Sequence, residues 1–215
     1  MTETDLLSLT QWLSPAFPVS AYAYSHGLEA EITHGRVHDG ETARDWIATV
    51  IEVGAGRNDA LILLAVLSGR DADEMADLAR ALAGSAERWE ETRAMGAAFA
   101  ETVAAMRGGN GVARPYPVAV GMAARALNVP HEVVAALYLQ ALAASLVSVA
   151  VRFVPLGQAE GQRIQAALQP RIAALAGDLA RLDAMAVEDH LGAAAFGADL
   201  ATMEHEGLEV RIFRT

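Results

Sequence analysis

The sequence has 215 residues, of which 53% are apolar, and a formal net charge of −11. A chain of this length and apolar content can bury a sizeable core, which excludes a disordered low-complexity protein. The acidic balance disfavours binding to nucleic-acid phosphates. The lack of cysteine excludes disulfides, thiolate metal sites and a cysteine nucleophile, and it is compatible with a reducing cytoplasm.

Nearly every segment predicts an α-helix, because Ala, Leu, Glu and Arg dominate and alternating β-branched residues are scarce. Asp71 and Ser85 stand where helix N-caps are expected, and Pro170 predicts a kink in the last long helix. Glycine-bearing turns are expected at residues 34–40 and 107–111. The helices are predicted, in chain order, at about residues 6–13, 22–32, 41–55, 58–67, 72–82, 86–106, 116–127, 131–153 and 156–182.

Residues 133–151 form an uncharged stretch of 19 residues, close to the length needed to cross a membrane. Alanine makes up much of it, and Gln140, Ser145 and Ser148 interrupt it, so insertion into lipid would gain little free energy. We therefore expect a helix buried all round inside a helical domain. The acidic start, MTETDLL, lacks the basic residues of an export signal, so we expect a cytoplasmic protein without a membrane segment.

These elements predict an all-α fold, a single helical domain of about nine or ten helices that spans residues 1–215. No Pro- or Ser-rich linker and no repeat of fixed period divides the chain. Residues from about 201 to 215 are expected to form a flexible C-terminal tail.

The six histidines do not form a recognisable metal motif. His34 and His38 have the spacing that brings two imidazoles to one helical face, but the glycines around them predict a turn. The glycine-rich segment 108–114 lacks the Lys-Ser/Thr pair of a phosphate loop, and no G-x-S-x-G motif occurs. The sequence therefore assigns no catalytic, cofactor-binding or metal-binding residue, and a Zn or Ni site built from distant residues stays open.

The first informative stretch is SPAFPVSAYAYSHGLE, residues 14–29. Pro15 and Pro18 reduce the entropy lost when the segment is ordered, which favours a preformed surface. Tyr22 and Tyr24 are typical interface residues, because their rings bury area while their hydroxyls find partners. The alternative is that the two tyrosines hold the loop to the protein's own core.

The second stretch is RFVPLGQAEGQ, residues 152–162. Arg152 is a cation near the end of the uncharged helix, where it complements the helix dipole, and Pro155 ends that helix. Two pairs of residues four apart follow and predict close helix packing, within one chain or between chains: Gly157 with Gly161, and Gln158 with Gln162.

The third stretch is ATMEHEGLEVRIFRT, residues 201–215. It carries Leu208, Val210 and Ile212 among arginines. A segment this apolar is expected to dock, either on its own chain or on another.

Together the three stretches resemble the signatures of the urease accessory protein F family (UreF). The first is similar to S-P-x-x-P-x-G-x-x-x-Y-S-x-G-L-E, with Ser20 where glycine is common. The second is similar to R-x-x-P-L-G-Q-x-x-G-Q, and the third to M-x-H-E-x-x-x-x-R-L-F-x-S, with mild departures at Ile212 and Thr215. The matching residues are Ser14, Pro15, Pro18, Tyr24, Ser25, Gly27, Leu28 and Glu29 in the first, Arg152, Pro155, Leu156, Gly157, Gln158, Gly161 and Gln162 in the second, and Met203, His205, Glu206, Arg211 and Phe213 in the third.

The resemblance implies an all-α, cytoplasmic, non-enzymatic chaperone for nickel insertion into urease. Members of the family form dimers, bind the accessory protein UreD (called UreH in some bacteria) and recruit the GTPase UreG to apo-urease. The tail is associated with UreD binding, and the Arg-Pro-Leu-Gly-Gln region with the dimer or partner surface. No cofactor is expected to bind this chain tightly, because the assembled complex handles the nickel. The candidates for partner binding are the matching residues other than Leu28, Leu156 and Gly161, together with Tyr22 and Arg214.

Two other classes compete with this interpretation. A helical metal-dependent hydrolase would need histidine and carboxylate side chains that converge in space. A helical DNA-binding regulator would need a basic recognition helix, and the acidic charge argues against one.

Overall fold

The computed structural model describes residues 1–191 and 195–215. This part of the chain contains ten α-helices, two short 3₁₀ helices and no strand, so the predicted all-α class is confirmed. The elements are α1 (Glu3–Trp12), η1 (Ala21–Ala23), α2 (Leu28–Thr33), α3 (Gly40–Val53), α4 (Ala55–Leu67), α5 (Ala72–Ala81), α6 (Ala86–Arg107), α7 (Tyr116–Ala124), α8 (His131–Phe153), α9 (Gln158–Ala180), η2 (Ala184–His190) and α10 (Phe196–Glu206).

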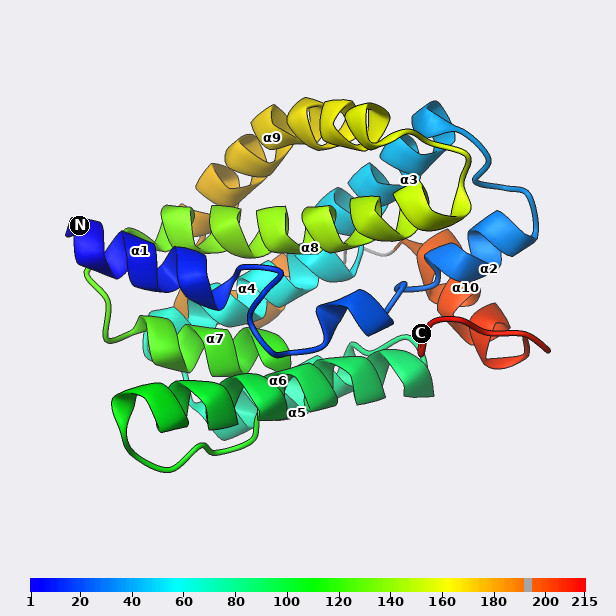
Figure 1. Cartoon of the computed structure of the whole chain (residues 1–215). Helices are drawn as coiled ribbons and strands as arrows, with labels where there is room; N and C mark the ends of the chain where they lie inside the picture. The colour runs from blue at the N-terminus through cyan, green and yellow to red at the C-terminus, as the bar shows by residue number, and fades with distance from the viewer. Residues whose placement is uncertain (192–194) are drawn as a thin grey trace.

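Helix α8 crosses the middle of the molecule, and other helices pack around it (Figure 1). Helix α9 returns along α8, while α3 and α4 contact it from behind. Helices α6 and α7 pair with each other, and α7 packs on α4. Helix α10 packs on α2 and α6, and the C-terminus lies close to these helices, on the side of the molecule away from the N-terminus (Figure 1). The buried apolar side chains form one connected cluster through these helices.

Among the described residues, α8 is the one helix long and apolar enough to cross a membrane. Half of its apolar window is buried inside the fold, so the expectation of burial all round is only partly correct. The side chains of α8 that are not buried are partly accessible or exposed, and they include large ones such as Leu137 and Leu142 as well as small ones such as Ser148.

Several predicted helix ends and turns are confirmed. The side chain of Asp71 accepts hydrogen bonds from two backbone N–H groups in the first turn of α5, and Ser85 accepts one in α6. The turn before α3 ends in a capping box between Asp39 and Thr42. Pro170 lies inside α9, which changes direction near its middle in Figure 1, because proline cannot donate the backbone hydrogen bond.

The helix predicted at residues 22–32 is interrupted, and this prediction is corrected. His26 and Gly27 have φ values of 59° and 82°, a left-handed backbone that cannot continue a right-handed helix. Gly27 is needed for a second reason: a Cβ there would lie 2.9 Å from the backbone nitrogen of Thr202 in α10. The break therefore lets α2 begin where α10 packs against it.

The flexible tail expected at residues 201–215 is also corrected. Residues 201–206 belong to α10, and the segment that follows returns to the protein. Phe213 and Thr215 are 6% and 1% exposed. Of the two alternatives for this apolar segment, the structure shows docking on its own chain.

The expected close packing at two glycines holds at one of them. A Cβ on Gly161 would lie 2.5 Å from the Cγ2 of Val151, so the start of α9 approaches the end of α8 closely. Gly157 has no atom within 4 Å of such a Cβ and has no packing role of this kind.

Candidate functional site

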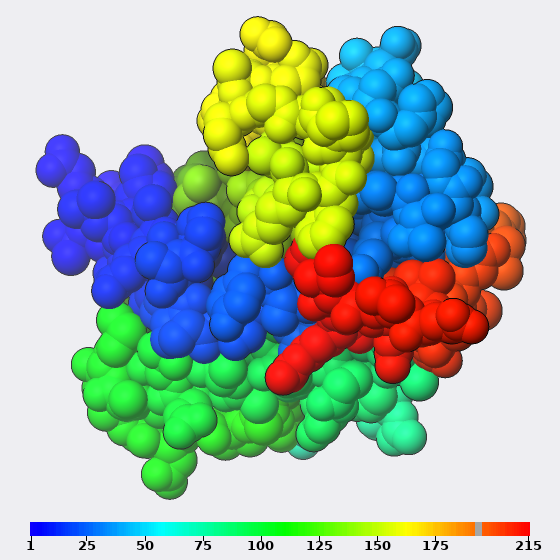
Figure 2. Space-filling view, turned by 45° about the vertical axis from the view of Figure 1, so that its right-hand side comes forward, coloured from blue at the N-terminus to red at the C-terminus, as the bar shows by residue number. Residues whose placement is uncertain are grey.

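The three sequence motifs, far apart in the chain, meet at one corner of the molecule. Figure 2 shows the C-terminal segment (red) between the N-terminal part (blue) and the turn that joins α8 to α9 (yellow-green). The guanidinium of Arg152 donates to the carbonyl oxygen of Tyr22 at 3.4 Å. The rings of Phe153 and Phe213 pack edge to face with their centroids 5.0 Å apart. The second motif thus contacts the first and the third.

The backbone of the first motif holds the end of the tail. The N–H of Arg214 donates to the carbonyl of Ala23 at 2.8 Å, and the N–H of Ser25 donates to the carbonyl of Thr215 at 2.7 Å. The hydroxyl of Ser25 donates to the same carbonyl. Two segments about 190 residues apart are therefore joined like a short pair of strands.

Glu29 in α2 is the acceptor around which this corner is built. Its carboxylate lies 2.9 Å from Nε2 of His205 and accepts hydrogen bonds from the backbone N–H groups of Ile212 and Phe213, at 2.8 and 3.0 Å. Because Glu29 is 6% exposed, water cannot easily replace these bonds. One side chain from the first motif thus orders both α10 and the tail.

His205 connects this acceptor to α6. It is fully buried, and its Nδ1 lies 2.6 Å from a carboxylate oxygen of Glu87. The other oxygen of Glu87 accepts a hydrogen bond from Arg211 at 2.6 Å. Four charged or chargeable side chains from α2, α6, α10 and the tail therefore form one network.

A second buried network lies beside the first. One oxygen of Asp59 in α4 accepts hydrogen bonds from the guanidinium of Arg88 at 3.0 Å and from the hydroxyl of Tyr138 at 2.9 Å. Glu91, one turn after Arg88 on α6, accepts a hydrogen bond from the hydroxyl of Thr215 at 3.0 Å. The tail therefore reaches both networks.

Burial and pairing set the charges of the second network. Burial raises the pKa of Asp59, against the opposing charge of Arg88. Burial would also raise the pKa of Glu91, but the charges of Arg88 and His26 outweigh it and lower that pKa to about 2. Burial would lower the pKa of Arg88, and the carboxylates of Glu91 and Asp59 raise it instead. Arg88 and Glu91 are consequently both charged at neutral pH.

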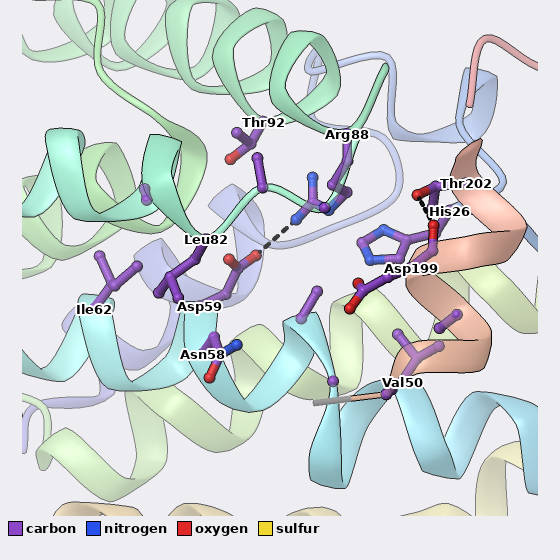
Figure 3. Close-up of a pocket in the computed structure, with 17 residues that line it drawn as sticks. His26, Val50, Asn58, Asp59, Ile62, Leu82, Arg88, Thr92, Asp199 and Thr202 are labelled. Carbon is purple, nitrogen blue, oxygen red and sulfur yellow. Dashed lines mark hydrogen bonds and ion pairs between the residues drawn. The ribbon is translucent and has the colours of Figure 1, made fainter. Parts of the chain in front are cut away.

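A cavity of about 50 Å³ lies beside this network, and Figure 3 shows His26, Asp59 and Asp199 around it. Three buried polar atoms on its walls have no hydrogen-bond partner among the described residues: His26 Nε2, Asn58 Oδ1 and Arg88 Nε. A polar space of this size suits one or two water molecules that would satisfy such atoms.

A larger cavity of about 440 Å³ lies between α8 and the segment 13–22. Pro15, Tyr22 and Arg152 line it and are exposed, so they mark its opening. Its inner part reaches Asp59 and Arg88 of the second network. This larger cavity therefore connects the exposed surface of the first two motifs with the buried charged residues of the second network.

The structure divides the predicted partner-binding residues into exposed and buried groups. Tyr22 is 66% exposed, whereas Tyr24 is 5% exposed and belongs to the core, which favours the anchoring alternative for Tyr24. The exposed residues are Pro15, Pro18, Tyr22, Arg152, Pro155, Gly157, Gln158, Gln162, Met203, Glu206, Arg211 and Arg214, with Ser14 half-buried. The buried residues are Tyr24, Ser25, Gly27, Glu29, His205 and Phe213.

Sequence reasoning missed Asp59, Glu87, Arg88 and Glu91. Each lies in a helix, where a charged residue normally faces solvent, so nothing in its neighbourhood marked it. The spacing of Arg88 and Glu91, three residues apart beside Thr92, was the one available signal of a shared buried face.

The structure also places the histidines. His34 and His38 lie at the end of α2 and just before α3, so the predicted turn is confirmed. Among residues 1–191 and 195–215, no group of three or more His, Asp or Glu side chains is arranged to hold a metal ion.

The fold and the converging motifs define an all-α protein, the fold class that the resemblance of the motifs implied. Comparison with known proteins identifies its family. A family model described as UreF matches residues 37–169. A protein of Jannaschia sp. (strain CCS1) named "Urease accessory protein UreF" is 63% identical over 211 residues, which cover 98% of this chain and 94% of that protein. Proteins of the same name from Cereibacter sphaeroides (strain ATCC 17023) and Paracoccus denitrificans (strain Pd 1222) are 58% and 46% identical, and the matches cover 98% and 99% of this chain and 98% and 97% of those proteins.

The chain therefore belongs to the UreF family of urease accessory proteins.

Proposed function

We propose that this chain is an adaptor of urease maturation that, together with UreD (UreH), recruits the GTPase UreG to apo-urease. In that cytoplasmic assembly it acts as a homodimer, modulates GTP hydrolysis and supports insertion of nickel, which is the cargo of the complex. The partners follow from the resemblance of the three motifs. The observation that carries the proposal is that these motifs, although far apart in sequence, form one ordered corner with exposed side chains.

The exposed side chains of this corner suit a protein partner. Tyr22 stands beside the cavity opening, and the docked tail presents Val210 and Ile212, which are 77% and 65% exposed. Apolar groups on an ordered segment gain from losing water and cost little conformational entropy on binding. The net charge of −11 favours a partner with a basic face.

The test is co-purification with UreD and UreG, combined with urease activation in the presence and absence of this chain. The wild-type chain should capture both proteins and increase activation. The double variant Tyr22→Ala/Ile212→Ala should weaken capture, whereas Val112→Ala, an exposed apolar residue in the loop between α6 and α7, should not. Failure of the wild-type chain to capture UreD or to change activation would show the proposal to be wrong.

Deletion of residues 208–215 is a poorer test than these substitutions. If residues 208–215 did not pack on the rest of the chain, their deletion would leave the fold intact and would affect only binding. In the structure the tail supplies donors to Glu29 and Glu91, so its deletion also exposes buried carboxylates. A loss of UreD capture after that deletion would mix altered stability with altered binding.

A further inference from the structure

The protonation state of His205 follows from its surroundings. Its Nε2 lies 2.9 Å from a carboxylate oxygen of Glu29, and its Nδ1 lies 2.6 Å from one of Glu87. An ionised carboxylate can only accept hydrogen bonds, so both ring nitrogens must carry a proton to donate. The geometry is that of an imidazolium held between two acids.

The charges of the network support the same state. Glu29 and Glu87 contribute two negative charges, and Arg211 contributes one positive charge through its contact with Glu87. The network is electrically neutral only when His205 is also positive. An unbalanced charge in a buried network is costly, and His205 lies in the last turn of α10, where the helix dipole favours a cation.

We propose that His205 is a proton-dependent latch for the C-terminal segment, residues 208–215. With two protons, His205 fixes Glu29 in the position where it accepts the N–H groups of Ile212 and Phe213. With one proton, a ring nitrogen directs its lone pair at a carboxylate, and the network keeps a net negative charge. Docking of the segment is therefore strongest when His205 carries both protons and weaker when it carries one.

The other titratable groups around His205 have partners of their own. On α2, Glu31 pairs with Arg36, and on α10 Glu204 pairs with Arg36 and His34. Arg88 on α6 and His26 in the segment before α2 both contact Glu91. On α10 itself, Glu206 accepts a hydrogen bond from the backbone N–H of Glu87. His205 is consequently the group that faces both Glu29 and Glu87.

The latch is a property of the isolated chain and does not depend on the proposed partners. Exposed Val210 and Ile212 are carried by the latched segment, so its release would also change the surface at this corner. Measurements on the chain alone therefore test the latch, and capture of UreD separately tests the proposed function.

The experiment is a pH titration of the full-length chain by ¹⁵N NMR, from about pH 5 to about pH 9. At the low end, both ring nitrogens of His205 should carry protons. As His205 loses one proton, the protection of the Ile212 and Phe213 amides should fall by at least about 10-fold with the same midpoint, after correction for intrinsic exchange.

The variant His205→Gln removes the titrating group, and its amide protection in the tail should not depend on pH in this range. His131→Gln, at the exposed start of α8, is the matched control and should keep the wild-type titration. If His205→Gln does not fold, the wild-type titration decides alone. An unprotonated ring nitrogen at the low end of the pH range, or amide protection that stays constant through the titration, would overturn the latch.

Discussion

Substitution of Glu29 by alanine tests the central contact of the corner. It removes an acceptor that three groups approach at 2.8–3.0 Å, on His205, Ile212 and Phe213. If the tail stayed docked, loss of one partner from a buried charged network would cost about 3–5 kcal/mol. If the tail were released, the loss would be the burial of Phe213, about 1.5–3 kcal/mol, and a few hydrogen bonds of about 1 kcal/mol each.

The less costly response dominates, so we expect the free energy of unfolding of Glu29→Ala to fall by about 3 kcal/mol. Urea unfolding followed by circular dichroism measures it, and the melting temperature should fall by about 6–12 °C. Glu90→Ala is the control, because Glu90 forms an exposed pair with Arg93 on α6. A stability of Glu29→Ala within about 0.5 kcal/mol of that control would refute the assigned role of Glu29.

Three further predictions use matched residues. Tyr24→Ala should lower the free energy of unfolding by about 3–5 kcal/mol, whereas Tyr22→Ala, at an exposed position, should change it by less than about 0.5 kcal/mol. Denaturant titration of both variants measures this difference, and equal losses would contradict the burial of Tyr24. Gly161→Ala should lower the free energy of unfolding by about 1–3 kcal/mol, because the added Cβ meets Val151, and Gly157→Ala should lower it by less than about 1 kcal/mol. The melting temperatures of both variants test this, and the reverse order would be incompatible with the packing of α8 on α9. Glu91 has a pKa of about 2 in the folded chain against an ordinary value of 4.5, so its contribution to stability is complete above pH 4.5 and is lost as the pH falls towards 2. Unfolding of the wild type across that range should show a loss of roughly 3 kcal/mol that Glu91→Gln lacks, and the same acid dependence in both proteins would contradict the charge assigned to Glu91.

Local sequence patterns predicted most of the helices and several of their ends correctly. Helix ends depend on neighbouring backbone groups, and a local pattern is therefore enough to predict them. Examples are the caps at Asp71 and Ser85 and the turn at residues 107–111. The break at His26 and Gly27 was not predictable in this way, because it depends on the approach of α10, far along the chain. Segments of this kind look helical by composition and are decided by tertiary contacts.

By itself the sequence determined an all-α chain with three motifs, and their order and spacing were enough to indicate its family. Helix propensity, apolar periodicity and end signals are local properties, so they can be read without a structure. Only the tertiary structure decided that Glu29 meets His205, that Arg88 and Glu91 are buried, and that residues 208–215 dock on their own chain. Those outcomes depend on which donor, far away in the sequence, reaches which buried acceptor. A buried polar group needs a hydrogen-bond partner, but the residues next to it in the sequence do not specify which one it finds.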